Sequence, residues 1–320
     1  MELNPEASSN GSGEGQHVKM LVIGSGPAGL SAALYGARAE LKPVVLTGMT
    51  LGGQVAITHI VENYPGFPEG LGGPELGELF KQQAERFGAQ VVFDTATEVD
   101  FSERPYKVKT YGNQYLADTV IIATGATPKH LNIPGEEEYV GRGVSYCGTC
   151  DGFFFKDKEV VVVGGGDSAM EEGTFLTRYA NKVTVIHRRD ALRAGAILAK
   201  RAKNNPKMEF VWDTQINTIA GEDDVDYLEL ENRKSGEKSR FDTDGVFIFI
   251  GHKPNTEMFD GILEMEDGYI TINKYMETSV PGVFAAGEVA DPHFRQVITS
   301  SGMGAAAAIQ ATRWLEDQAD

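Results

Sequence analysis

The sequence has only two cysteines and two tryptophans among its 320 residues. No apolar run approaches the ~20 residues that a membrane-spanning helix needs, and the first residues lack the basic and apolar pattern of a signal peptide. Lys and Arg number 29 against 46 Asp and Glu, which gives a formal net charge of -17. The electrostatic field of such a charge repels polyanions, which disfavours a surface that binds nucleic acid or an anionic membrane. We therefore expect a cytoplasmic protein that binds neither nucleic acid nor membrane.

The two cysteines, Cys147 and Cys150, are spaced as C-x-x-C. This spacing is compatible with a structural disulfide, a zinc site or a redox-active pair. A bridge this local removes little entropy from the unfolded chain, which disfavours a purely structural role. A structural zinc site usually has four Cys or His ligands, and the six histidines include no H-x(3-5)-H pair. The pattern therefore favours reversible thiol-disulfide exchange and predicts no metal.

The length allows two domains. The apolar fraction of 41% and the 38 glycines are typical of an α/β protein with many tight turns. Residues 1–16 are polar and rich in Gly and Ser, so we expect a disordered leader there. We expect helices at 73–87 and 300–315, the second capped by Ser300 or Ser301, and an antiparallel strand excursion between 91 and 120.

A first nucleotide-binding turn is predicted after the apolar run 18–23. The turn reads Gly24-Ser25-Gly26-Pro27-Ala28-Gly29 and is followed by an alanine-rich helical stretch. In G-x-G-x-x-G, the first glycine makes the bend, the second admits a pyrophosphate and the third allows close helix packing. About twenty residues after such a turn, many sites carry a carboxylate that binds a ribose, but this chain has Thr47 at that position. The ribose of this dinucleotide must therefore be held in another way.

A second turn follows the buried strand predicted at 158–163. Its residues are Gly164, Gly166, Asp167, Ser168 and Ala169. The next predicted strand, at 182–186, leads into a basic run where an NAD site would carry an acid. The run contains His187, Arg188, Arg189 and Arg193. Because guanidinium groups bind the 2'-phosphate of NADP, this cluster favours NADPH over NADH.

Two nucleotide turns and one redox pair predict two Rossmann-like, three-layer α/β domains, one of them holding a flavin. The apolar runs that end near 125–128 and 251–254 are predicted linkers. The second domain is then inserted into the first. The expected boundaries are 17–126 and 253–320 for an FAD-binding domain, and 127–252 for an NADPH-binding domain that carries the disulfide.

With these motifs assembled, the chain resembles the bacterial-type, low-molecular-weight thioredoxin reductases over about residues 17–316. The resemblance includes the stretch Cys147-Gly148-Thr149-Cys150-Asp151-Gly152-Phe153-Phe154 and both glycine turns. It implies a homodimeric flavoenzyme that passes electrons from NADPH through FAD and its own disulfide to thioredoxin. It also implies that the inserted domain rotates about the two linkers. The FAD contacts implied by the resemblance are Gly24, Gly26, Pro27, Ala28, Gly29, Gly53, Gln54, Asn63, Thr124, Gly125, Gly287, Glu288, Arg295 and Gln296.

By the same resemblance, Cys150 is the sulfur that faces the flavin, and Cys147 is the one that attacks thioredoxin. Asp151 resembles the proton donor of the family, whereas a helix-start acid is the alternative. Phe153 and Phe154 resemble a pair that docks thioredoxin, whereas core packing is the alternative. The chain departs from the family at Glu288, where Asp is usual, and at Gly148, where Ala is common.

Two other functions are compatible with these motifs. A related flavoprotein would reduce a different dithiol, a peroxidase module or a ferredoxin-type acceptor. A redox-sensing binding protein would keep both nucleotides as ligands and turn over slowly.

Overall fold

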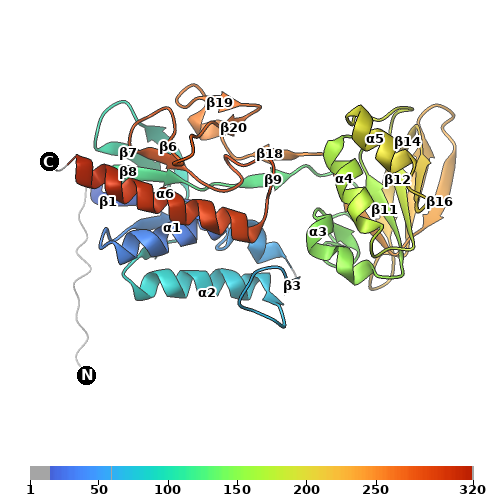
Figure 1. Cartoon of the computed structure of the whole chain (residues 1–320), viewed down its shortest axis with the longest axis horizontal. Coiled ribbons are helices and arrows are strands. Elements are labelled where there is room, and N and C mark those ends of the chain that lie inside the picture. Colours follow the sequence, from blue (N-terminus) through green and yellow to red (C-terminus); the bar gives the residue numbers. More distant parts are fainter. Residues whose placement is uncertain (1–14, 59, 319–320) are drawn as a thin grey trace. The chain divides into compact units, whose positions relative to one another are not determined.

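The computed structural model describes residues 15–58 and 60–318, which form two compact units (Figure 1). As far as its residues are described, unit 1 comprises Met1–Ile57, Gly73–Gly125 and Pro254–Asp320. Unit 2 comprises Thr58–Gly72 and Ala126–Lys253. The segment Thr58–Gly72, which the sequence pattern assigned to the first domain, thus groups with unit 2.

Unit 1 is built on a seven-stranded sheet with the order β5-β2-β1-β8-β7-β6, in which β21 also pairs with β8. The strands β5, β2, β1, β8 and β21 are parallel, whereas β6 and β7 form the predicted antiparallel excursion. The strands of this sheet are β1 (Gln16–Ile23), β2 (Val44–Leu46), β5 (Gln90–Val92), β6 (Ala96–Asp100), β7 (Tyr106–Thr110), β8 (Gln114–Ile122) and β21 (Val283–Ala285).

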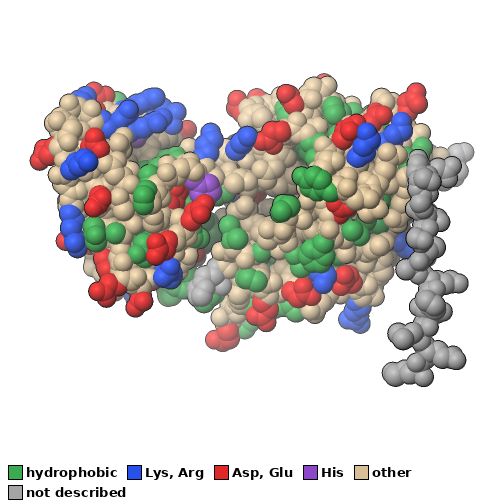
Figure 2. Space-filling view, turned by 180° about the vertical axis from the view of Figure 1, so that it is seen from behind, with side chains coloured by type: hydrophobic (Ala, Val, Ile, Leu, Met, Phe, Trp, Pro, Cys, Tyr) green, Lys and Arg blue, Asp and Glu red, His purple; other side chains and the backbone are tan. Residues whose placement is uncertain are grey.

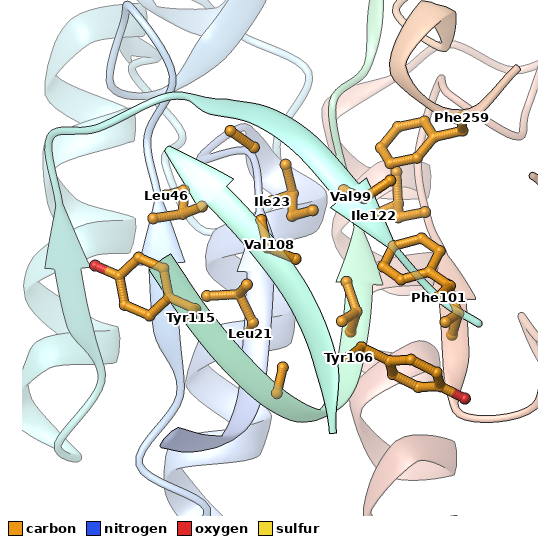
Figure 3. Close-up of a cluster of buried hydrophobic side chains, with 14 of the residues drawn as sticks. Leu21, Ile23, Leu46, Val99, Phe101, Tyr106, Val108, Tyr115, Ile122 and Phe259 are labelled. Carbon is orange, nitrogen blue, oxygen red and sulfur yellow. The ribbon is translucent and has the colours of Figure 1, made fainter. Parts of the chain in front are cut away.

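Three helices cover one face of this sheet: α1 (Pro27–Arg38), α2 (Gly73–Arg86) and α6 (Val297–Asp317). Small side chains, mostly alanines of α1 and α6, fill the core on that face and let these helices approach closely. The opposite face has larger side chains, including Phe101, Tyr106 and Phe259 (Figure 3). The alternation of side chains across a strand explains how β1 serves both cores, with Met20 and Val22 on the helix side and Leu21 and Ile23 on the other.

Two predicted ends in unit 1 are wrong. The strand β1 begins at Gln16, which pairs with Tyr115, so the predicted leader extends one residue too far; residues 1–14 lie outside the described residues. The helix α6 begins at Val297, and its cap is Gln296 rather than Ser300 or Ser301. Gln296 and Thr299 form a reciprocal capping box, which a glutamine provides less often than a serine does.

Unit 2 contains a five-stranded parallel sheet with the order β10-β17-β11-β12-β13. Valines alternate along β11, so that Val160 and Val162 pack toward the helices while Val161 and Val163 pack toward a separate three-stranded antiparallel sheet. The elements are β10 (Val144–Ser145), β11 (Glu159–Val163), β12 (Lys182–Ile186), β13 (Met208–Val211), β17 (Gly245–Ile248), α4 (Asp167–Leu176), α5 (Ala196–Lys203), β14 (Thr214–Ala220), β15 (Tyr227–Asn232) and β16 (Lys238–Asp242). Both units confirm the predicted α/β class.

The remaining elements are short. A two-stranded ladder pairs β9 (Ala126–Pro128) with β18 (His252–Pro254), at the boundaries of the longer segment of unit 2, Ala126–Lys253. The others are β3 (Ile60–Val61), β4 (Leu71–Gly72), β19 (Met265–Glu266), β20 (Tyr269–Ile270), α3 (Gly148–Asp151) and the 3-10 turns η1 (Gly53–Ile57), η2 (Gly152–Phe155) and η3 (Glu257–Phe259).

Candidate functional site

Cys147 and Cys150 form a disulfide, with their Cα atoms 5.3 Å apart. Cys147 precedes α3, and its Sγ accepts a hydrogen bond from the backbone N–H of Cys150 at 3.2 Å. Both cysteines are half-buried in unit 2. A thiolate formed at Cys147 would keep this backbone donor, which favours the charged form of the sulfur.

Asp151 is tied to the disulfide through Ser145, a residue that the sequence reasoning missed. The Ser145 hydroxyl donates to Oδ2 of Asp151 at 2.6 Å and accepts from the backbone N–H of Cys147 at 3.1 Å. Ser145 lies on β10 and is buried, so the strand fixes the position of its hydroxyl. One serine thus holds both the Asp151 carboxyl group and the backbone of Cys147.

Three consecutive phenylalanines follow the disulfide, and only the third is buried. Phe153 is 58% exposed and Phe154 is 42% exposed, whereas Phe155 packs against Phe247 in the core. The ring of Phe153 lies edge-on to Tyr179. The exposure of the first two rings disfavours the core-packing alternative for them.

The first glycine turn leaves room for an anion at the start of α1. A Cβ atom added to Gly26 would meet no atom within 4 Å, whereas one on Gly29 would overlap the carbonyl oxygen of Gly24. No side chain caps α1, and its first turn has no acidic residue. The open side of Gly26 and the backbone donors of the helix therefore fit a pyrophosphate.

Other predicted FAD contacts converge on this turn. A Cβ on Gly53 would lie 3.3 Å from the Cα of Gly26, and one on Gly287 would lie 2.9 Å from the Cβ of Ala28. The buried Ser25 hydroxyl donates to the carbonyl of Thr47 and accepts from the backbone of Gly52, which holds the Gly53 loop in place.

Two predicted FAD contacts have other surroundings. The Thr124 hydroxyl donates to the carbonyl of Asn255 at 2.7 Å, and the Asn255 side chain returns a bond to the carbonyl of Thr124 at 2.8 Å. Asn63 lies in Thr58–Gly72 and thus in unit 2. The Thr124–Asn255 exchange is a contact that spacing in the sequence does not reveal.

Glu288, which stands where Asp is usual in the family, has a carboxyl group with a raised pKa. Burial raises the pKa of its carboxyl group to about 7, against the opposing charge of Arg295 and with a further contribution from Asp291. Also near the start of α6, the Ser301 hydroxyl is buried and has no hydrogen-bond partner among the described residues. Polar groups of this kind are what a bound polar ligand would satisfy.

We expect the pH dependence of stability to report on Glu288. The pKa of Glu288 is about 7 in the folded protein against an ordinary 4.5. The contribution of its carboxyl group to the free energy of unfolding is therefore fully present below pH 4.5 and is lost as the pH rises through 7. In FAD-free protein, the wild type should lose about 2 kcal/mol of its free energy of unfolding by pH 8, and Glu288→Gln should not show this loss. Urea unfolding between pH 5 and pH 8 would measure it, with the exposed Glu316→Gln as control. If the free energy of unfolding changed with pH equally in Glu288→Gln and in the wild type, the raised pKa would not belong to Glu288.

The second glycine turn lies at the start of α4 and is likewise open at its middle glycine. A Cβ on Gly166 would meet no atom within 4 Å, and no side chain caps α4. The loop after β12 closes on this turn. The backbone N–H groups of Arg193 and Gly195 bond to the carbonyl of Gly165 and to Oδ1 of Asp167, each at 2.7 Å.

The His187 ring packs against this turn so closely that a Cβ on Gly165 would overlap it. Burial lowers the pKa of His187, and the charges of Arg193, Arg189 and Arg188 lower it further against a hydrogen bond with the backbone of Ala191, so the ring is mainly neutral at pH 7. Its Nε2 has no hydrogen-bond partner among the described residues. Arg188, Arg189 and Arg193 are exposed. Lys and Arg side chains gather along the top of unit 2, which is the left-hand body in Figure 2.

A buried acid lies beside the disulfide segment and was not predicted. Glu136, 1% exposed, accepts bonds from the backbone of Leu131 and Asn132 and from the hydroxyl of Tyr146 at 2.9 Å. The Tyr146 hydroxyl also lies 2.8 Å from Nδ1 of His130. Burial raises the pKa of Tyr146, which therefore stays protonated and links the segment after β9 to the residue before Cys147.

Across residues 15–58 and 60–318, no His, Cys, Asp and Glu side chains are grouped so as to hold a metal ion. None of the helices in these ranges is long and apolar enough to cross a membrane.

Comparison with known proteins agrees with this arrangement. The model of the family described as pyridine nucleotide-disulphide oxidoreductase matches residues 18–305. The thioredoxin reductase of Rickettsia felis is 50% identical over 303 residues, covering 93% of this chain and 98% of that protein. That of Mycolicibacterium smegmatis is 49% identical, covering 93% and 97%.

Among solved structures, the thioredoxin reductase of Streptococcus pyogenes has a TM-score of 0.90 at 42% identity, covering 95% of this chain and 100% of that one. The matches extend through both units and confirm the resemblance that the motifs indicated. The chain belongs to the pyridine nucleotide-disulphide oxidoreductase family.

Proposed function

We propose that this protein is a thioredoxin-disulfide reductase with FAD and NADPH as cofactors. The observation that carries the proposal is the Cys147–Cys150 disulfide, held between a strand and a short helix in the unit that contains the second nucleotide turn. Relatives about half identical over nearly the whole chain bear that name. When bound, FAD takes a hydride from NADPH and supplies two electrons to a disulfide.

For FAD, we propose the turn at Gly24, Gly26 and Gly29 as the pyrophosphate cradle. The open approach at Gly26 and the uncapped start of α1 support it. Glu288 is neutral or charged near pH 7, so it can donate or accept a hydrogen bond toward the ribityl hydroxyls. The further residues assigned to FAD are Pro27, Ala28, Gly53, Gln54, Asn63, Thr124, Gly125, Gly287, Arg295 and Gln296.

For NADPH, we propose the turn at Gly164 and Gly166 with the arginines that follow β12. The exposed guanidinium groups of Arg188, Arg189 and Arg193 suit a 2'-phosphate, and the neutral His187 keeps an unpaired ring nitrogen at the turn. Ser168 and Ala169 complete this group, while Asp167 holds the loop that carries Arg193.

Asp167 offers a test of the NADPH assignment. Asp167→Ala removes the acceptor of the Gly195 N–H, so the loop of Arg193 loses an anchor. We expect the Kd for NADPH to rise about 5- to 10-fold and that for NADH to change little, since only NADPH uses the arginines. Isothermal titration of the oxidised enzyme would measure both. Asp167→Asn keeps the acceptor oxygen and should resemble the wild type; equal losses for both nucleotides would refute this role.

In the thiol-disulfide exchange, we propose that Cys147 attacks and Cys150 resolves. The Cys147 sulfur bonds to one sulfur of the substrate disulfide while the other leaves with the electron pair. The Cys150 sulfur then attacks Cys147, which re-forms the enzyme disulfide and releases the second substrate thiol. We propose that Asp151 supplies a proton in this cycle, which its hydrogen bond to Ser145 beside Cys147 supports.

The partner surface is proposed at Phe153 and Phe154, whose rings are exposed and which come three and four residues after Cys150. We also propose a homodimer in the cytoplasm, on the resemblance. The disulfide and the NADPH residues share unit 2, so we propose that this unit rotates about β9 and β18 to serve the flavin and the partner in turn.

The function is tested anaerobically with the purified holoenzyme. NADPH should bleach the flavin, and oxidised thioredoxin added next should restore its colour as thioredoxin is reduced. Colour that returns with another dithiol protein but not with thioredoxin would keep the redox chemistry and overturn the proposed partner. A flavin that NADPH does not bleach would overturn the enzyme assignment altogether.

A further inference from the structure

The disulfide turn has a second acidic neighbour, Glu172, which belongs to α4. Its Oε2 accepts a hydrogen bond from the backbone N–H of Thr149 at 3.2 Å. Thr149 lies between the two cysteines. The carboxylate is half-buried, so water screens its charge less than it would on an exposed surface.

Two adjacent backbone donors of this turn have different acceptors. The N–H of Cys150 bonds to Sγ of Cys147, whereas the N–H of Thr149 bonds to Glu172. Both N–H groups belong to the turn that Cys147 precedes, where backbone donors stabilise a thiolate. Glu172 thus engages the Thr149 N–H, while the hydroxyl of the same Thr149 lies 3.4 Å from the Cys147 sulfur. Its carboxylate adds a negative charge beside the turn, which disfavours a thiolate at Cys147.

Gly148 makes this arrangement possible. A Cβ at this position would lie 2.6 Å from Oε2 of Glu172 and 3.5 Å from its Cβ. Both separations involve the side chain of Glu172, and the first is too short for a real contact. An alanine, common here in the family, would displace the carboxylate from the N–H of Thr149. The departure at Gly148 thus has a physical reason, which is room for an acid beside the disulfide.

We propose that Glu172 is a positioning residue that holds the disulfide turn through Thr149 and disfavours the thiolate form of Cys147 in the reduced enzyme. This inference rests on the proposed function only in taking the pair to be redox-active. A less stable thiolate makes the reduced pair less stable relative to the disulfide, and hence a stronger reductant. Glu172 would thus favour electron donation to the partner.

Other titratable groups surround the turn and must be held constant. They include Asp151 within the turn, Tyr179 beside Gly152, and Tyr146 with its neighbours His130 and Glu136. Glu171, next to Glu172 on α4, is exposed and provides a matched control of equal charge.

The test is the pH profile of Cys147 alkylation by iodoacetamide in the reduced holoenzyme, with the modified sulfur located by mass spectrometry. Glu172→Gln should move the midpoint down by about 0.5 to 1 pH unit, so that alkylation below the midpoint becomes about 3- to 10-fold faster. Gly148→Ala, which displaces the carboxylate but keeps it, should move the midpoint the same way by less. Glu171→Gln should leave the profile as in the wild type.

A second readout is the equilibrium of the pair with glutathione, where Glu172→Gln should become harder to oxidise. An alkylation profile that is unchanged, or that moves upward, in a Glu172→Gln protein with full flavin content would overturn the proposal. If Glu172→Gln fails to retain flavin, the alkylation profile of Gly148→Ala becomes the test. A Gly148→Ala profile equal to that of the wild type would then overturn the proposal. Neither readout uses thioredoxin, so the proposed function can stand or fall separately.

Discussion

Cys147→Ser should abolish thioredoxin reduction, lowering kcat/KM by at least about 1,000-fold, because the enzyme can then neither form its disulfide nor attack the substrate. NADPH should still bleach the flavin, since the glycine turns and the arginine cluster are untouched. NADPH consumption with oxidised thioredoxin measures the first effect, and flavin absorbance measures the second.

Cys150→Ser separates the roles of the two sulfurs. It should lose turnover to a similar extent but should retain a Cys147 thiol that forms a mixed disulfide with thioredoxin and cannot be resolved. Mass spectrometry after non-reducing separation would identify this adduct. An adduct that forms with Cys147→Ser instead would reverse the assignment of attacking and resolving cysteine.

Gly26→Ala and Gly29→Ala should fail in different ways, although the two glycines belong to one turn. A methyl group on Gly26 meets only open space, and its φ of -67° suits alanine, so FAD-free protein should keep its stability. The methyl group would instead occupy the proposed approach of the pyrophosphate and weaken FAD binding about 10- to 100-fold. Fluorescence titration of FAD-free protein would measure the affinity.

A methyl group on Gly29 would overlap the carbonyl oxygen of Gly24, which a backbone cannot easily move aside. Gly29→Ala should therefore lower the free energy of unfolding of FAD-free protein by about 2 to 4 kcal/mol. Urea unfolding with Gly26→Ala as control tests this difference. Equal stabilities of the two variants would show that the turn relaxes and that our account of Gly29 is wrong.

The parts of the site that are local in sequence could be predicted. Each glycine turn lies between a strand and a helix that adjoin it in the chain, and the disulfide joins residues three apart, so spacing alone indicates the arrangement. The antiparallel excursion of β6 and β7 was likewise visible in the alternation of its residues.

The parts that depend on contacts between distant segments could not. Glu172 meets Thr149 only because α4 packs beside α3, and no spacing marks that pair. Ser145 reads as an ordinary strand residue until its hydroxyl is seen between Asp151 and Cys147. The raised pKa of Glu288 comes from burial, which a sequence does not display.

The β9–β18 ladder bears on how a domain can be inserted into a chain of this kind. On the side of unit 1, the backbone N–H of Asn255 bonds to the carbonyl of Gly125 at 3.0 Å; on the side of unit 2, that of Lys129 bonds to the carbonyl of Gly251 at 2.9 Å. The two ends of the segment Ala126–Lys253 therefore meet at this ladder, while the rest of unit 2, Thr58–Gly72, joins unit 1 elsewhere in the chain. A gene segment for Ala126–Lys253 can therefore be joined to a host at one place, as in an evolutionary domain insertion, but an exchange that keeps unit 2 whole must also replace Thr58–Gly72.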